Sequence, residues 1–238
     1  ALVESAAMAA VTMPPLTYQH HLPASTVSTG KLSAAQLEAV SYVGQVHEQT
    51  LLNGQRRGAF VGDGTGVGKG REISGIILDN FAQGRTKAVW LSKNEILLED
   101  AKRDFGDAGG DPNQLFYLGK IKAGTPIKQG RGVLFGTYST LAKNFNVQPG
   151  ATPAQQAEAR QRSRLEQLVQ WLGDDFDGVI AMDESHLLGS ALATPGSRGQ
   201  KKAADRALAA VTLQNRLPKA RVVYVSATGA SSVANLAY

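Results

Sequence analysis

The sequence is 238 residues long, 42% hydrophobic and 19% charged, which is typical of a folded globular protein and excludes a disordered or fibrous chain. It holds no cysteine, so disulfide bonds and thiolate metal sites are excluded. Its 25 Lys and Arg against 20 Asp and Glu give a net charge of +5, which suits an anionic partner but does not identify one. No stretch is apolar enough to span a bilayer, so we expect no membrane partner.

The N-terminal residues 1–30 begin with an apolar run that lacks a basic start and is broken by Pro14 and Pro15. Such a run is not a secretory signal, and we expect a flexible arm. Apolar residues then recur at helical spacing behind Ser33, a candidate N-cap, and predict a helix that ends near Gly54.

Strands and helices alternate along the rest of the chain. The predicted strands span 57–62, 87–92, 177–184 and 220–228, and residues 132–141 are predicted as a strand followed by a turn. The predicted helices span 70–84, 94–106, 151–173 and 201–218. Four of the strands are continuous apolar runs, a pattern typical of parallel strands that helices cover on both faces. We therefore predict an α/β fold with a mostly parallel sheet, which binds ligands beyond the carboxyl ends of its strands.

A glycine-rich stretch, GDGTGVGKGR, follows the first predicted strand. Glycines allow the backbone angles of such a turn and the close approach of a phosphate, and the following helix offers its positive end. A G-x-G-K turn between a buried strand and an amphipathic helix predicts a nucleotide site in which Lys69 reaches the β- and γ-phosphates. The predicted nucleotide-binding residues of the turn are Gly64, Thr65, Gly66, Val67, Gly68, Lys69, Gly70 and Arg71.

Two acidic residues, Asp183 and Glu184, end the strand predicted at 177–184. A nucleotide's Mg²⁺ needs a carboxylate that holds it through its water shell, and attack on the γ-phosphate needs a group that orients or deprotonates water. We assign the first role to Asp183 and the second to Glu184. His186 completes a D-E-S-H box and is expected to link the acids to the next motif.

A third motif, S-A-T, closes the last predicted strand with Ser226, Ala227 and Thr228. Small hydroxyl residues at this place can hydrogen-bond the acidic box and transmit its state. We therefore expect these three residues to couple the nucleotide site to other parts of the protein.

The order and spacing of these motifs resemble motifs I, II and III of the superfamily 2 helicases. WLSKN, after the strand at 87–92, and TYSTL, at the end of the strand and turn at 132–141, are similar to motifs Ia and Ib of that superfamily. The stretches GDGTGVGKGREISGII and LPKARVVYVSATGAS are more specifically similar to the strawberry notch family of helicase-like NTPases. This resemblance implies that residues 31–238 form the first RecA-like ATPase lobe, with ATP and Mg²⁺ as cofactors.

The resemblance also implies roles for single residues. It makes Lys69 the phosphate lysine, Asp183 the Mg²⁺ ligand and Glu184 the catalytic acid. Gln36, in the helix before the turn, matches a glutamine that reads adenine in many superfamily 2 proteins. The residues that match segments holding the backbone of a DNA or RNA strand are Ser92, Lys93, Thr137, Tyr138 and Ser139.

Gly70 departs from the superfamily 2 pattern, which has Ser or Thr at this position, with a hydroxyl that binds Mg²⁺. The strawberry notch family is similar to this chain in having glycine there. The resemblance thus implies that metal binding relies more on Asp183, phosphates and water.

We expect an ATPase lobe that couples ATP hydrolysis to translocation on, or remodelling of, DNA or RNA. The sequence stops ten residues after Thr228, so the second RecA-like lobe that supplies arginine fingers would come from a C-terminal part or a partner. We therefore expect weak hydrolysis by this lobe alone.

Two other functions stay open from the sequence. One is a nucleotide-dependent switch or binding module that never translocates. The other is a different P-loop enzyme such as a small-molecule kinase, against which S-A-T and TYSTL argue. Since nothing resembles a nuclear signal, we expect a bacterial, cytoplasmic protein; a nuclear location is the alternative for a eukaryotic one.

Overall fold

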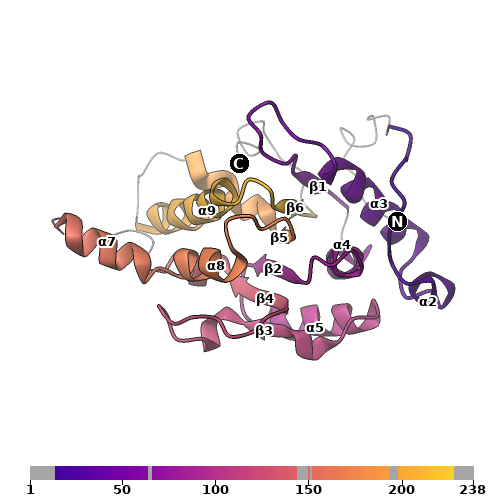
Figure 1. Cartoon of the computed structure of the whole chain (residues 1–238), viewed down its shortest axis with the longest axis horizontal. Helices are drawn as coiled ribbons and strands as arrows, with labels where there is room; N and C mark the ends of the chain where they lie inside the picture. Colours follow the sequence, from indigo (N-terminus) through magenta and orange to yellow (C-terminus); the bar gives the residue numbers. More distant parts are fainter. Residues whose placement is uncertain (1–13, 64–65, 144–149, 151, 193–197, 228–238) are drawn as a thin grey trace.

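The predicted alternation builds one parallel sheet in the computed structural model, which describes residues 14–63, 66–143, 150, 152–192 and 198–227 (Figure 1). The strands lie in the order β1-β6-β5-β2-β4-β3, and every neighbouring pair is parallel. Their bounds are β1 Ala59–Val61, β2 Lys87–Ser92, β3 Leu115–Tyr117, β4 Gly132–Thr137, β5 Val179–Asp183 and β6 Arg221–Val225. The predicted α/β fold of the RecA-like P-loop type is confirmed.

The helices follow the predicted pattern with three differences. The helix predicted to end near Gly54 ends at His47, and residues 138–141, at the end of the segment predicted as strand and turn, form a short helix. The helix bounds are α2 Ala24–Ser28, α3 Ala34–His47, α4 Lys69–Ala82, α5 Leu97–Asp107, α6 Tyr138–Leu141, α7 Pro153–Gln161, α8 Arg164–Leu172 and α9 Arg198–Arg216. The single helix predicted at 151–173 is two helices, because the Ser163 side chain accepts a hydrogen bond from the Glu166 amide and so caps a new helix. No helix within the described ranges is long and apolar enough to cross a membrane.

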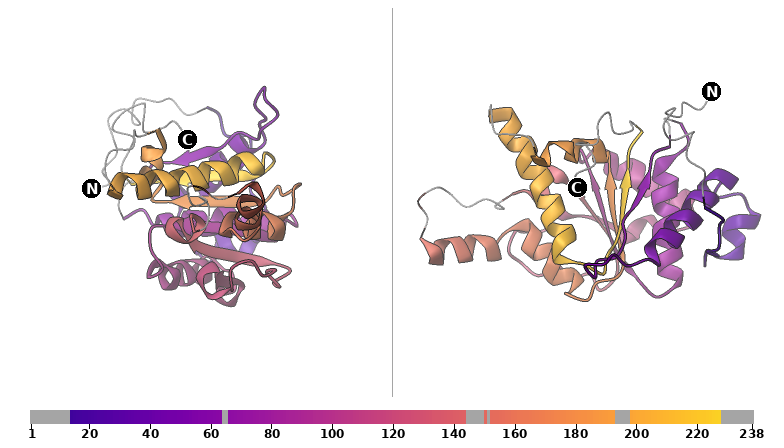
Figure 2. Two further views of the ribbon diagram at one scale, coloured as in Figure 1. Left: turned by 90° about the vertical axis from the view of Figure 1, so that its left-hand side faces the viewer. Right: turned by 90° about the horizontal axis from the view of Figure 1, so that it is seen from above.

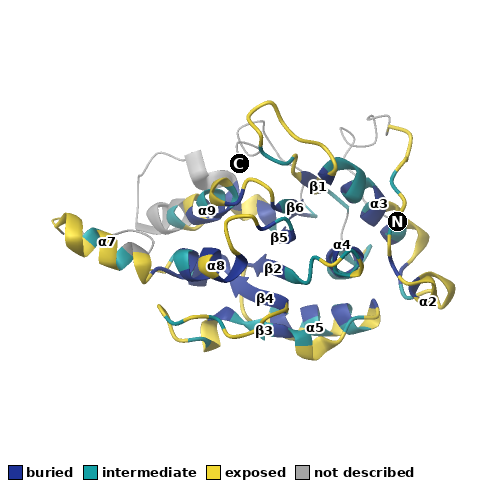
Figure 3. Cartoon of the chain, in the orientation of Figure 1, coloured by how far each residue is buried: buried dark blue, intermediate teal, exposed yellow. Residues whose placement is uncertain are grey.

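Side chains of β2 alternate between the two faces of the sheet and so separate two cores. Ala88 and Trp90 pack with buried residues of α3, α4 and α5. Val89 and Leu91 pack with buried residues of α6, α8 and α9 on the opposite face. Figure 2 shows α9 and α3 on opposite sides of the strands, and Figure 3 shows the central strands buried over most of their length. Burial on both faces explains why the strands are continuous apolar runs.

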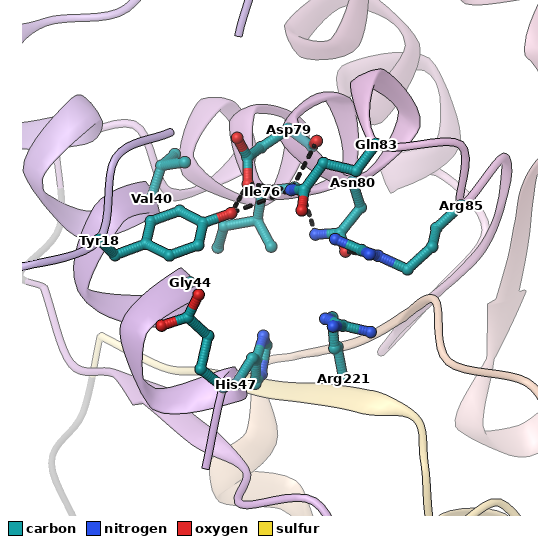
Figure 4. A pocket seen from close by; sticks show the side chains of 11 residues that line it. Tyr18, Val40, Gly44, His47, Ile76, Asp79, Asn80, Gln83, Arg85 and Arg221 are labelled. Atoms are coloured by element: carbon teal, nitrogen blue, oxygen red, sulfur yellow. Dashed lines mark hydrogen bonds between the residues drawn. The ribbon is translucent and has the colours of Figure 1, made fainter. Parts of the chain in front are cut away.

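The segment before α3 packs against the body of the protein, contrary to our expectation of a flexible arm over residues 1–30. The Tyr18 hydroxyl donates to Asp79 Oδ2 of α4 at 2.6 Å and accepts from Gln83 Nε2 at 2.9 Å (Figure 4). The amide of His21 donates to the second oxygen of the Asp79 carboxylate. Leu22 and Thr26 are buried, at 7% and 3% exposed. The expectation is wrong for residues 14–30, while residues 1–13 lie outside the described residues.

Candidate functional site

The glycine-rich turn leaves the end of β1 and enters α4 at the carboxyl edge of the sheet. Gly66 and Gly68 have positive φ values, 98° and 88°, which L side chains rarely adopt. A Cβ on Gly68 would also lie 2.7 Å from Gln36 Nε2, so both conformation and space require glycine there. The predicted residues Gly64 and Thr65 lie outside the described residues.

Gln36 supports this turn with both the nitrogen and the oxygen of its side-chain amide. Its Nε2 donates to the Val67 carbonyl at 2.8 Å, and its Oε1 accepts from the Ser33 amide at 2.9 Å within a capping box. The side chain is only 6% exposed. Gln36 therefore braces the phosphate loop in this structure, and its reading of adenine stays a prediction.

Lys69 begins α4, and its ammonium group lies over the turn. The Nζ atom donates to the Asp63 carbonyl at 3.3 Å, so the side chain folds back across the loop. Gly68 precedes α4 and has no side chain that could cap the helix, and the amides of Arg71 and Glu72 both donate to the Gly68 carbonyl. A positive helix end and a folded-back lysine fit the phosphates of a nucleotide.

The acidic box meets the end of β2. Asp183 Oδ2 accepts from the Ser92 hydroxyl at 3.1 Å, and Oδ1 accepts from the Glu184 amide at 2.9 Å. The Tyr138 hydroxyl donates to the Asp183 carbonyl at 2.7 Å. Burial, and then the nearby Glu184 charge, raise the pKa of the Asp183 carboxyl above its ordinary value. A cation at this carboxylate would be favoured because it would offset both effects.

Glu184 stands in a left-handed backbone conformation, with φ 53°, unusual for a residue other than glycine. Lys93 Nζ lies 3.1 Å from its Oε1, and His186 Nδ1 lies 3.5 Å from its Oε2. The carboxylate is thus held between two basic groups at the carboxyl end of the sheet. Strain of this kind is typical of functional positions.

His186 joins the acidic box to the S-A-T motif. Its Nδ1 lies 3.0 Å from the Ser226 hydroxyl, which is buried at the end of β6. The structure therefore brings His186, Glu184 and Ser226 together, as the sequence predicted. Ala227 follows at the end of the described chain, and Thr228 lies outside it.

The residues present fit a hydrated Mg²⁺. Among the described residues, no group of three His, Asp or Glu side chains gathers to hold a metal ion. Mg²⁺ does not need such a group, since it keeps several waters and is held by one or two carboxylates together with nucleotide phosphates. Each oxygen of Asp183 accepts one hydrogen bond from the protein and keeps a lone pair for a metal-bound water.

Three of the five residues predicted to contact nucleic acid have buried side chains. Ser92 is held by Asp183, Thr137 caps α6, and Tyr138 holds the Asp183 carbonyl. Their exposed fractions are 0%, 6% and 2%. In this structure the three side chains position the acidic box and α6, and their contact with nucleic acid stays a prediction. Lys93 is exposed and Ser139 partly so.

Gly70 packs directly against α5. A Cβ on Gly70 would lie 2.0 Å from Asp104 Oδ2, so the carboxylate fills the space of a side chain at this position. The next residue, Arg71, pairs with Asp107 through Nη2 and Oδ2 at 2.6 Å. Arg71 was predicted to bind nucleotide, whereas here it ties α4 to α5. Asp104 and Asp107 could not be found from the sequence, because partners on another helix leave no local pattern.

Because the Asp104 carboxylate lies against Gly70, a side chain with a hydroxyl at position 70 would fit only if that carboxylate moved. Gly70→Thr should displace the Asp104 carboxylate and lower the free energy of unfolding by about 1 kcal/mol, the low end for overpacking, because a side-chain end can move. Adding Asp104→Ala should restore most of the loss in a double-mutant cycle of urea unfolding. Gly130→Thr is the matched control, since open space surrounds Gly130. Additive effects of the two substitutions would contradict this explanation.

Comparison with known proteins places the chain in a family. The model of the family described as P-loop containing NTP hydrolase pore-1 matches residues 1–238. Protein strawberry notch homolog 1 of Gallus gallus is 43% identical over 242 residues, and Protein strawberry notch of Drosophila melanogaster is 42% identical over 243 residues. Protein FORGETTER 1 of Arabidopsis thaliana is 38% identical over 243 residues.

All of this chain is covered in these alignments, but only 18%, 14% and 17% of those three relatives. The chain thus spans less than a fifth of the length of the relatives it matches. The relatives come from vertebrates, fly, worm and plant, which contradicts our expectation of a bacterial, cytoplasmic protein. Absence of a nuclear signal was too weak an observation to decide the source. The match over the whole chain shows that it belongs to the P-loop containing NTP hydrolase pore-1 family, as a P-loop domain of the strawberry notch family.

Proposed function

We propose that this domain is the ATP-binding lobe of a helicase-like ATPase of superfamily 2, which couples ATP hydrolysis to translocation on, or remodelling of, DNA or RNA. The observation that carries the proposal is the chain of contacts from the acidic box to the third motif. His186 lies within 3.5 Å of Glu184 and 3.0 Å of Ser226, so a change at the acid reaches the end of β6. A site for hydrolysis alone has no need of that connection.

The proposed chemistry follows from the positions of three side chains. Lys69 and the first amides of α4 would hold the β- and γ-phosphates, and Asp183 would hold Mg²⁺ through water. The bound Mg²⁺ would neutralise charge on the phosphates. Glu184 would orient the attacking water and accept its proton. Lys93 and His186 lie against its two oxygens, at 3.1 and 3.5 Å.

In this proposal, bound nucleic acid acts on ATP hydrolysis through Lys93. Its side chain is 47% exposed, yet its ammonium group pairs with Glu184 at 3.1 Å. A backbone phosphate that attracts Lys93 would compete for this pair and release the Glu184 carboxylate. Exposed pairs of this kind contribute little to stability and exchange partners at small cost.

The proposal predicts nucleic-acid-stimulated ATP hydrolysis in the full-length protein. Phosphate release should rise severalfold when single-stranded DNA or RNA is added. Lys93→Met should raise the unstimulated rate and reduce the stimulation to about twofold or less, because Glu184 is then free throughout. Lys120→Met, at an exposed position away from the acidic box, should behave like the natural protein. No stimulation by either nucleic acid would contradict the proposal.

A second candidate is a nucleotide-dependent switch or binding module that never translocates. The burial of Ser92, Thr137 and Tyr138 favours it, since few side chains at the ends of β2 and β4 remain to track a strand. This function predicts nucleotide binding, and slow hydrolysis, that neither DNA nor RNA changes. The same hydrolysis assay therefore separates the two candidates.

A further inference from the structure

A carboxyl group that the proposed chemistry does not use lies behind the phosphate loop. Glu72 is on α4, three residues after Lys69, and its exposed fraction is 0%. Within the described part of the chain, neither of its carboxyl oxygens has a hydrogen-bond donor. An ionised carboxylate that is buried without donors is strongly disfavoured, so something else must offset the cost of burying this carboxyl group.

A neighbouring carboxyl group, that of Asp63, can offset this cost. The carboxyl group of Asp63, two residues past the end of β1, lies within hydrogen-bonding reach of Glu72. Two carboxyl groups can form a hydrogen bond only when one of them carries a proton. Asp63 is partly exposed and Glu72 is fully buried, so the proton belongs on Glu72.

Electrostatics agree with this assignment. Burial, followed by the hydrogen bond and charge of Asp63, raises the pKa of Glu72 from its ordinary value of 4.5 to about 8. The charged groups that act on Glu72 are Asp63 and Lys69, and Lys69 alone opposes the rise. The proton is therefore retained at neutral pH and lost in mildly alkaline solution.

We propose that Glu72 is a positioning residue for nucleotide binding: its protonated carboxyl donates to the Asp63 carboxylate and joins the start of the phosphate loop to α4. The bond holds Asp63, whose carbonyl accepts from Lys69 Nζ at 3.3 Å. It thereby fixes the part of the loop over which the phosphate lysine lies. The inference rests on the proposed binding of a nucleotide at this loop.

The bound nucleotide and the Glu72 proton should favour each other. Phosphates add negative charge next to the pair and draw Lys69 towards themselves, which raises the pKa of Glu72 further. Since the protonated form then binds better, nucleotide affinity is highest below pH 8 and falls as the pH rises past the pKa of the free protein. The lost proton passes to the solvent.

Unfolding without nucleotide tests the shared proton. The folded chain binds one more proton than the unfolded chain between the two pKa values of Glu72, so stability from this group is lost as the pH rises towards 8. In urea, the unfolding constant of the natural chain should rise about tenfold or more from pH 6 to 8, relative to Glu72→Gln. Equal pH dependence in the two chains would overturn the proposal.

Nucleotide titration tests the positioning role. From pH 7.5 to 9, affinity for a fluorescent ATP analogue should fall severalfold in the natural chain and less than about twofold in Glu72→Gln, whose amide donates at every pH. Asp63→Asn should also flatten the profile, because its amide donates to an ionised Glu72. Glu38→Gln, at an exposed position on α3, should keep the natural profile.

The possible outcomes are distinct. Binding with the natural alkaline loss in Glu72→Gln would overturn the role of Glu72 while leaving the proposed function intact. No nucleotide binding by any chain at any pH would contradict the proposed function and with it the link to nucleotide.

Discussion

Lys69→Ala is expected to weaken ATP binding by about 10- to 100-fold, the cost of losing a hydrogen bond to a charged group. The structure gives the reason, since the ammonium group lies over the loop and no other cation reaches the Asp63 carbonyl among the described residues. Alanine keeps the helix, because its helix propensity is at least that of lysine. Titration with a fluorescent ATP analogue measures the effect.

A matched substitution separates the site from general charge loss. Lys120→Ala removes the same charge at an exposed position and should leave the affinity unchanged. Circular dichroism and urea unfolding should show that both variants fold like the natural chain. Unchanged ATP affinity in Lys69→Ala would contradict the assignment of the phosphate loop.

Glu184→Gln should lower ATP turnover by about 100-fold or more, the usual contribution of a general base, while ATP affinity changes less than about twofold. Glutamine keeps the shape of the side chain but accepts no proton from water. The substitution also leaves Asp183 and Lys69 in place, so the binding residues remain. Phosphate release by the full-length protein at saturating ATP gives the turnover.

Glu99→Gln, an exposed carboxyl on α5, is the control for this substitution and should turn over ATP at the natural rate. The left-handed backbone at Glu184 is retained in both proteins, so a change in stability is not expected to explain the loss. Normal turnover in Glu184→Gln would remove this residue from the role of general base.

The fold could be predicted because its strands are buried on both faces. Runs such as VIAM and RVVYV cannot alternate between core and solvent, and helical spacing between them indicates crossover helices. The edge strand β3 was not predicted, since a three-residue strand carries almost no period. The break at Ser163 was also missed, because a cap inside a long amphipathic pattern depends on how the two parts pack.

The candidate site was predictable where residues adjoin in sequence and unpredictable where they meet across helices. Lys69, Asp183 and Glu184 follow strand ends, and parallel strand ends lie at one edge. Gly70 shows the opposite case. Its glycine was interpreted as a change in metal chemistry, whereas the structure shows the Asp104 carboxylate in the space of the missing side chain. That contact joins residues 34 positions apart, which no local pattern reveals.

The hydrogen bonds from Tyr18 and His21 to Asp79 decide where a recombinant fragment of this domain should begin. Asp79 is 2% exposed, and its carboxylate relies on donors from Tyr18 and His21 as well as Gln83. A fragment cut at residue 31, the predicted start of the ATPase lobe, would remove two of these three donors from a buried carboxyl group. A fragment that starts at or before residue 14 retains them, and with them the helix that carries Lys69.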